Sequence, residues 1–241
     1  MPGYMMHLCE GTYIINKLDP SADGNTGVCN DFLLGTIIPD AVSDKSLTHF
    51  RPQWQHDLIT KYPDINSVID AYPTNLMTAA DLGIISHLMM DAAYVKDFWP
   101  KYFHFESLSD TETAIANDIH HVRMTQNSMQ PNGCTIPFSE FFSSRFFYGD
   151  YDITNPLFFS DMHPYIPNLK SCDISIIPCR MYDHVKLGVD IASFTLHDEH
   201  TAALTTSVFP YADLKSFVIE CADSFLNFLD QRSISILSPR S

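Results

Sequence analysis

The sequence lacks the signature motifs of several large enzyme classes. Its 241 residues contain no Gly-x-Ser-x-Gly stretch, no Gly-x-Gly-x-x-Gly and no Walker pattern. Hydrolases with a nucleophile elbow and the common nucleotide-binding folds are therefore disfavoured. Glycine is also scarce, with 9 residues against 15 Pro, 17 Phe and 11 Tyr. This composition is typical of helices joined by well-packed irregular segments.

Signals for export or membrane insertion are also missing. No stretch reaches the roughly 18 apolar residues that a membrane span requires. The first residues, MPGYMMHLCEGTYIINKL, lack the basic flank, long apolar run and cleavage site of a signal peptide. The six cysteines are scattered without a Cys-x-x-Cys pair, which favours free thiols in a reducing compartment. We therefore expect a cytoplasmic protein without a membrane span.

Positive charge is in short supply. The chain has 14 Lys and Arg against 29 Asp and Glu, a formal net charge of -15. This balance opposes binding to a phosphate backbone or an anionic membrane, so we expect no nucleic-acid partner. A small phosphorylated substrate remains compatible, because bound divalent cations can invert the field where it binds.

Helical periodicity dominates what is present. Apolar spacing predicts a helix over residues 3–18, a second over 28–38 that Pro39 ends, and a third over 75–99 that Pro100 ends. A short helical piece is expected around INSVIDAY. The amphipathic pattern of 211–231 predicts the last helix.

The remaining segments are harder to interpret. Ser109 and Glu112 resemble a capping box, which predicts another helix over 109–129. Residues 131–210 mix aromatic and turn residues and predict an irregular cap. The expected fold class is mainly α: a single domain over 1–241, with helices in 1–130, the cap in 131–210 and a C-terminal helix at 211–231.

A histidine and an aspartate lie four residues apart in the third helix, DLGIISHLMMDAAYVKDFW. Positions i and i+4 are neighbours on a helix, so His87 and Asp91 can present a ring nitrogen and a carboxylate to one point. One interpretation is a core histidine satisfied by an aspartate. The other is a pair of ligands for zinc or a similar cation.

The metal interpretation gains weight from three residues upstream. His7 lies beside the apolar stripe of the first helix, Asp40 follows the helix-ending Pro39, and His49 lies in THF. With His87 and Asp91 they could supply two adjacent cations bridged by a carboxylate. Such a pair acidifies a water and holds the oxygens of a phosphoryl group.

The ordered series MPGYMMH, FLLGTIIPDA, KSLTHF and GIISHLMMD resembles the bacterial zinc-dependent phospholipase C family. That family includes the amino-terminal domain of glycosylphosphatidylinositol-specific phospholipase D and is related in fold to the single-strand-specific zinc nucleases. The resemblance covers about residues 1–130. It implies an all-helical, phospholipase C/nuclease-like domain with zinc ions in a cleft.

Carried over to this chain, the resemblance implies a role for each of these residues. His7 would bind one zinc, His49 and His87 another, and Asp91 would bridge the two. Asp40 would be a ligand or the catalytic general base that handles the attacking water. A carboxylate beside cations has a lowered pKa, so such a base depends on water acidified by the metal.

The chain departs from the family where the third zinc binds. Asp97 occupies the position six beyond Asp91, where the family has a histidine. On the helix expected over 109–129, Asp118 and His121 are three residues apart and could share a face. A remodelled third site at Asp97, Asp118 and His121 is one alternative. Others are the loss of this site and its use by a harder cation than zinc.

The expected activity is hydrolysis of a phosphodiester or phosphomonoester by a metal-activated water. The membrane-active family members are secreted and use a processed N-terminus as a ligand, whereas this chain begins Met-Pro-Gly. We therefore expect a soluble phosphate ester as substrate. The alternative is a non-catalytic helical binding protein with a structural metal or none. The other candidate histidines, His163, His184, His197 and His200, are interpreted as structural or exposed.

Overall fold

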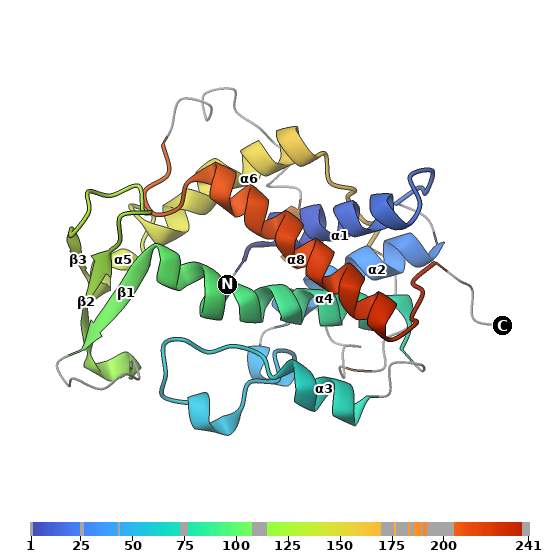
Figure 1. Cartoon of the computed structure of the whole chain (residues 1–241), viewed down its shortest axis with the longest axis horizontal. Helices are drawn as coiled ribbons and strands as arrows, with labels where there is room; N and C mark the ends of the chain where they lie inside the picture. The colour runs from blue at the N-terminus through green and yellow to red at the C-terminus, as the bar shows by residue number, and fades with distance from the viewer. Residues whose placement is uncertain are drawn as a thin grey trace.

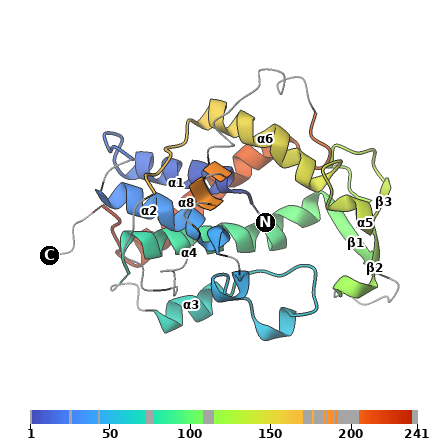
Figure 2. The same cartoon turned by 180° about the vertical axis from the view of Figure 1, so that it is seen from behind.

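The computed structural model is mainly helical, as the sequence predicts. It describes residues 2–24, 27–42, 44–72, 77–107, 115–169, 176, 183, 186–188, 190–191 and 205–237. A small antiparallel sheet lies at one end of the helices (Figures 1 and 2). Within the described residues no helix is long and apolar enough to cross a membrane.

Four helices form the larger half of the molecule: α1 (Tyr4–Leu18), α2 (Gly27–Ile37), α4 (Ala79–Ala93) and α8 (Tyr211–Gln231). Each agrees with a predicted helix, and α8 has the predicted bounds. Helix α2 packs along α4, and α8 crosses α1 and α4 (Figure 1). The short α3 (Ile65–Ala71) matches the helical piece expected there.

Two glycines allow α2 and α4 to touch backbone to backbone. A Cβ on Gly35 would lie 2.0 Å from the Ala80 carbonyl oxygen, and one on Gly83 would lie 2.1 Å from the Phe32 carbonyl oxygen. Any larger residue at either position would push the helices apart. Helix α4 starts at a capping box in which Thr78 and Asp81 bond each other's backbone N–H. These contacts fix where the later residues of both helices lie.

Helices α2 and α4 each end near a proline, where the α-helix gives way to another type of helical turn. Helix α2 continues into a 3₁₀ helix, η1 (Ile38–Ala41), in which Pro39 takes an early position. Helix α4 continues into a π-helical segment, η5 (Tyr94–Phe98), and a 3₁₀ turn, η6 (Trp99–Lys101). Two further 3₁₀ turns, η2 (Lys45–Leu47) and η3 (Gln53–Gln55), follow η1.

The helix predicted over 109–129 is wrong for residues 119–124. Strand β2 (Ile119–Met124) pairs antiparallel with β1 (Phe103–Ser107) and β3 (Thr135–Pro137). Only Ala116–Asp118 forms a 3₁₀ turn, and the proposed cap residues Ser109 and Glu112 lie outside the described residues. The apolar spacing of IHHVRM fits either structure, and pairing with two neighbouring strands decides it.

The segment expected as an irregular cap contains more regular structure than predicted. Besides β3 it holds the short α5 (Phe138–Phe141) and the 16-residue α6 (Phe147–Met162), which tolerates an internal Pro156. His163 ends α6 in the left-handed conformation, with φ 47°. Most of 170–204 lies outside the described residues.

The buried apolar residues form two clusters of different composition. The aliphatic core lies among α1, α2, α4 and α8 and is rich in Ile and Leu. The aromatic core lies around η5, η6, the sheet and the start of α6, and is rich in Phe, Tyr and Trp. Helices α1 and α4 contribute to both cores. The buried polar residues of α1 and α4 therefore lie between the two cores.

Candidate metal centre

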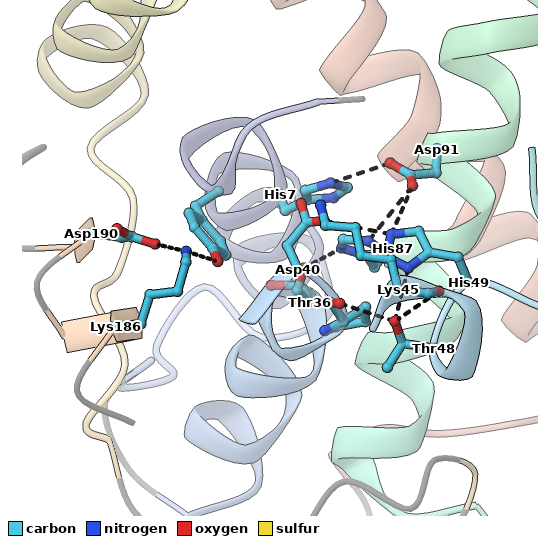
Figure 3. Close-up of polar contacts among 12 residues, drawn as sticks. His7, Thr36, Asp40, Lys45, Thr48, His49, His87, Asp91, Lys186 and Asp190 are labelled. Atoms are coloured by element: carbon cyan, nitrogen blue, oxygen red, sulfur yellow. Dashed lines mark hydrogen bonds and ion pairs between the residues drawn. The ribbon is translucent and has the colours of Figure 1, made fainter. Parts of the chain in front are cut away.

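The five predicted ligands come from four segments and meet between α1 and α4 (Figure 3). His7 lies in the second turn of α1, Asp40 in η1, His49 two residues after η2, and His87 and Asp91 on α4. The three histidines are 0% exposed and Asp91 is 1% exposed. The packing of α2 on α4 brings η1 to the middle of α4.

The two carboxylate oxygens of Asp91 face different histidines. Oδ1 lies 3.7 Å from His7 Nε2, while Oδ2 lies 3.3 Å from His49 Nε2 and 3.8 Å from His87 Nε2. Asp40 Oδ1 lies 3.5 Å from His49 Nε2. Ligands of one tetrahedral zinc, bound at about 2.1 Å, are about 3.4 Å apart. The spacings are therefore those of atoms that share a cation.

The same atoms are left without hydrogen-bond partners. Among the described residues, the Nε2 atoms of His7, His49 and His87 and both carboxylate oxygens of Asp91 are buried and accept or donate no hydrogen bond. A buried unsatisfied polar group costs about 1–3 kcal/mol, so proteins rarely bury five of them facing one another. A cation among them removes this cost, and the group fits a metal ion.

Hydrogen bonds to the other ring nitrogens orient two of the histidines. His87 Nδ1 lies 2.8 Å from the Thr36 carbonyl oxygen, which can only accept, so Nδ1 carries the hydrogen. His49 Nδ1 lies 2.8 Å from Thr48 Oγ1, and that hydroxyl donates to the Pro39 carbonyl at 3.0 Å. In both rings Nε2 is left with a free lone pair, as a metal ligand requires.

The surroundings of His87 and His49 shift their pKa values in opposite directions. His7 and His87 stack with centroids 3.9 Å apart, which disfavours two positive charges. Burial and the neighbouring His7 lower the pKa of His87 to about 3. Burial also acts to lower the pKa of His49, but its contacts with Asp40 and Asp91 outweigh burial and raise it.

The two aspartates stay ionised. Burial alone would raise the pKa of Asp91, but His87, His49 and His7 overcome this effect and hold it well below the usual value. The pKa of Asp40 is likewise lowered despite burial, because His49, His87 and Lys45 favour the carboxylate. As metal ligands the three imidazoles would be neutral, and with the two carboxylates they would form an N and O donor set of charge about -2, which suits a divalent cation.

The ligand atoms form two overlapping groups. His7, Asp40 and His87 make one group, and His49, His87 and Asp91 make the other, each with its atoms within 4.8 Å of one another. His87 has one free nitrogen and can serve one cation only. The arrangement can therefore hold one divalent cation, or two that share a carboxylate.

Glu10, Lys45 and Arg51 are ionisable residues near the centre that were not predicted from the sequence; the charges of Asp91 and Asp40 act to raise the pKa of Arg51, but burial outweighs them and lowers it. Glu10 is fully buried one turn after His7, with Oε2 4.0 Å from His7 Nδ1, and burial raises its pKa. Lys45 forms an ion pair with Asp40. The i, i+3 spacing of His7 and Glu10 was a usable signal for the first, whereas a lysine in a polar loop gives none for the second.

The residues predicted for a third site do not join this group. Asp97 is exposed on η5, His121 is exposed on β2 and Asp118 is half-buried before that strand. Because β2 is a strand, the prediction that Asp118 and His121 share a helix face is wrong. No candidate group of metal ligands among the described residues contains any of the three. His184, His197 and His200 lie outside the described residues.

Comparison with known proteins adds no relative to this picture. No family model, no curated protein and no solved structure matches the chain. The conclusion from geometry alone is that buried His and Asp side chains from three helical elements and one loop form a candidate metal-binding centre.

Proposed function

We propose that the protein is a metal-dependent hydrolase that cleaves a phosphate ester with a metal-activated water. The observation that carries the proposal is the division of the Asp91 carboxylate, with one oxygen toward His7 and the other toward His49 and His87. A carboxylate that bridged two cations would have to divide its oxygens in this way. The sequence resemblance to the zinc-dependent phospholipase C family supports the same assignment.

Zinc is the metal we propose, in two sites joined by Asp91. Imidazole nitrogens and carboxylate oxygens are common zinc ligands, although manganese and iron also suit such a set. When bound, these ions lower the pKa of a water and hold phosphoryl oxygens. His7, His49 and His87 would supply neutral nitrogen donors once the metal has displaced any proton, and hydrogen bonds at Nδ1 orient the rings of His49 and His87.

Asp40 is the residue we assign to the attacking water. Its side chain is 9% exposed, the most of the five, so this is the side on which solvent and substrate would reach the centre. Its pKa is lowered, which makes it a weak base. It can orient the water through a hydrogen bond and accept a proton that the metal has already acidified.

A second candidate is a non-catalytic protein stabilised by its metal. The complete burial of His7, His49 and His87 favours it, because structural sites are closed whereas catalytic sites keep an open position. Chelation separates the two. A structural metal predicts a large drop in melting temperature, while a catalytic pair in a preformed helical bundle predicts lost activity with a modest drop.

The first experiment is elemental analysis of wild-type protein and His87→Ala, followed by a screen of phosphate esters. We expect about two equivalents of metal in the wild type and a sharp fall in the variant. His56→Ala is the matched control, because His56 is an exposed histidine that pairs with its neighbour Asp57. Wild-type protein that binds neither zinc nor manganese would remove the hydrolase proposal.

A further inference from the structure

Both tryptophans of the chain line one cavity, which has a volume of about 410 Å³. One wall is the loop 54–62, which carries Trp54 and Tyr62. The other wall is the segment 95–105, which carries Trp99 and runs from η5 to β1. Small-molecule sites are commonly cavities of about 300–1,000 Å³ with apolar and aromatic walls and a few polar groups. The size and composition of this cavity fit such a site.

Polar contacts hold the loop wall in place. The side-chain oxygen of Gln55, a residue that is 0% exposed, accepts a hydrogen bond from the Tyr62 backbone N–H at 2.8 Å. The Ala116 backbone N–H donates to the Asp57 carbonyl at 2.8 Å. Lys96 on η5 lies over the Tyr62 ring, with Nζ 5.1 Å from the ring centroid, and so ties the loop to the opposite segment. The cavity is therefore preformed.

The aromatic rings of each wall meet at steep angles. The rings of Trp54 and Tyr62 are inclined at 76°, with centroids 6.3 Å apart. Those of Trp99 and Phe105 are inclined at 72°, with centroids 6.2 Å apart. Two rings at such an angle offer a ring face beside a ring edge. A flat ring placed there would stack on one and meet the edge of the other, the two geometries that aromatic pairs prefer.

Trp54 leaves much of its indole uncovered. Its side chain is 64% exposed, the most of the large apolar side chains among the described residues. Covering an indole removes a large apolar area from water, and tryptophan is the residue type most enriched among those that dominate binding energy at protein interfaces. A ring bound in the cavity would cover the face of Trp54 that the protein leaves open.

The side chains of the walls disfavour a charged ligand. None of the residues that line the cavity is Asp, Glu, Lys or Arg, although the chain has 29 Asp and Glu. A ligand cation would also meet the charge of Lys96, which already lies over Tyr62. Thr60 and His104 add polar groups that can form hydrogen bonds with a substituent. The walls therefore suit an uncharged ring that carries a polar substituent.

We infer that this cavity binds an uncharged planar aromatic group, held between Trp54 and Trp99. The inference goes beyond the proposed hydrolase activity and does not depend on it, because none of the candidate metal ligands lines the cavity. Stacking gives the site its selectivity, so an aromatic ring should bind better than a saturated ring of similar size.

Titration with 2-naphthol tests the site, with decahydro-2-naphthol as its saturated analogue. The chain has two tryptophans, so isotope-labelled protein has two indole N–H signals in its NMR spectrum, and we expect 2-naphthol to shift both. The saturated analogue covers apolar area without stacking, so it should bind about fivefold more weakly or worse. Trp54→Leu should lower the affinity for 2-naphthol by a similar factor, whereas Trp54→Phe, which keeps a ring, should retain most of it.

A matched control is available on α6. Tyr148 is also an exposed aromatic residue, at 54%, and does not line the cavity. Tyr148→Leu should therefore bind 2-naphthol as wild type does. The inference is overturned if wild-type protein does not bind 2-naphthol, if it binds the saturated analogue equally well, or if Trp54→Leu binds as tightly as wild type. Tighter binding of tetramethylammonium than of 2-naphthol overturns the assignment to an uncharged ring.

The variant His87→Ala separates this inference from the proposed function. We expect the folded variant to bind 2-naphthol with wild-type affinity, whatever its metal content. If wild-type protein binds the ring but no metal, the aromatic site stands and the proposed hydrolase activity fails. If folded His87→Ala loses the ring together with the metal, an independent aromatic site is overturned.

Discussion

Two buried aspartates in different halves of the molecule have contrasting surroundings. Asp150 on α6 lies beside the aromatic core, is 2% exposed and accepts hydrogen bonds from the backbone N–H groups of Ser207, Val208 and Phe209. Asp91 on α4 is 1% exposed, and neither of its oxygens has a hydrogen-bond partner among the described residues.

The difference lies in what surrounds each carboxylate. The donors around Asp150 are backbone groups of 207–209, so its role is to attach that segment to α6. The atoms facing Asp91 are histidine nitrogens at 3.3–3.8 Å, a spacing that fits a shared cation better than hydrogen bonds. Burial alone does not mark a site, whereas unsatisfied burial facing other ligand atoms does.

The largest difference between the two aspartates is expected in metal binding, when each is replaced in turn by asparagine. Asp91→Asn removes an anionic oxygen from the candidate centre and should reduce metal affinity by more than the roughly 100-fold seen for outer-shell partners. Asp150→Asn should leave metal per folded chain unchanged. Elemental analysis and zinc titration measure both. Full metal content in Asp91→Asn would mean that the cluster is a structural histidine group.

For the free energy of unfolding, we expect Asp150 to matter more than Asp91. Asp150→Ala leaves the backbone N–H groups of 207–209 without this acceptor, two of them buried and one part-buried, and each buried one costs about 1–3 kcal/mol. The free energy of unfolding should fall by about 3 kcal/mol or more, measured by urea denaturation in the presence of a chelator. A loss below about 1 kcal/mol would show that segment 207–209 is held by other contacts.

Removing an orienting group should have a smaller effect on the metal. Thr48→Val deletes the hydroxyl that accepts from His49 Nδ1, so zinc affinity should fall about 10- to 100-fold. Thr154→Val on α6 is the matched control, since Thr154 is also a buried threonine and lies on the Asp150 helix. Equal zinc affinities in the two variants would contradict the role assigned to Thr48.

The smallest effect is the pH dependence of metal binding. A metal must displace any proton from His49, and the neighbouring carboxylates raise the pKa of this residue above its ordinary value of 6.5. Below that raised pKa, affinity should fall by about tenfold per pH unit, and above it the dependence should level off. Zinc titrations from pH 5.5 to 8.5, a range of about three units, would locate the change. A midpoint at or below the ordinary histidine value would contradict the contacts assigned to His49.

The predictability of the fold differs between the two halves. Apolar residues at helical spacing and stop signals locate α1, α2, α4 and α8; the first three are buried on nearly all sides, and α8 buries one side. The sheet was missed since the short run 119–124 has no period of its own. Helix α6 was missed because its aromatic residues and Pro156 obscure any helical pattern. The conformations of the sheet and of α6 are both determined by tertiary packing in the aromatic core.

The candidate centre could be anticipated because its ligands are polar residues in apolar surroundings. His7, His87 and Asp91 interrupt buried helix faces, and Asp40 follows a helix-ending proline, so the sequence itself marks them. Lys45 belongs to a polar segment where a lysine is ordinary. Its approach to Asp40 depends on the tertiary fold, which spacing along the chain does not reveal.

The contact between α2 and α4 has a consequence for which ions the centre can take. Gly35 and Gly83 leave no side chains between the two backbones, and the Thr36 carbonyl that orients His87 lies at this contact. Such a joint cannot widen without separating the helices, since there is no flexible side chain to yield. Calcium, with bonds of about 2.3–2.6 Å and six to eight ligands, would demand that expansion. A rigid joint beside His87 would therefore favour cations of small radius.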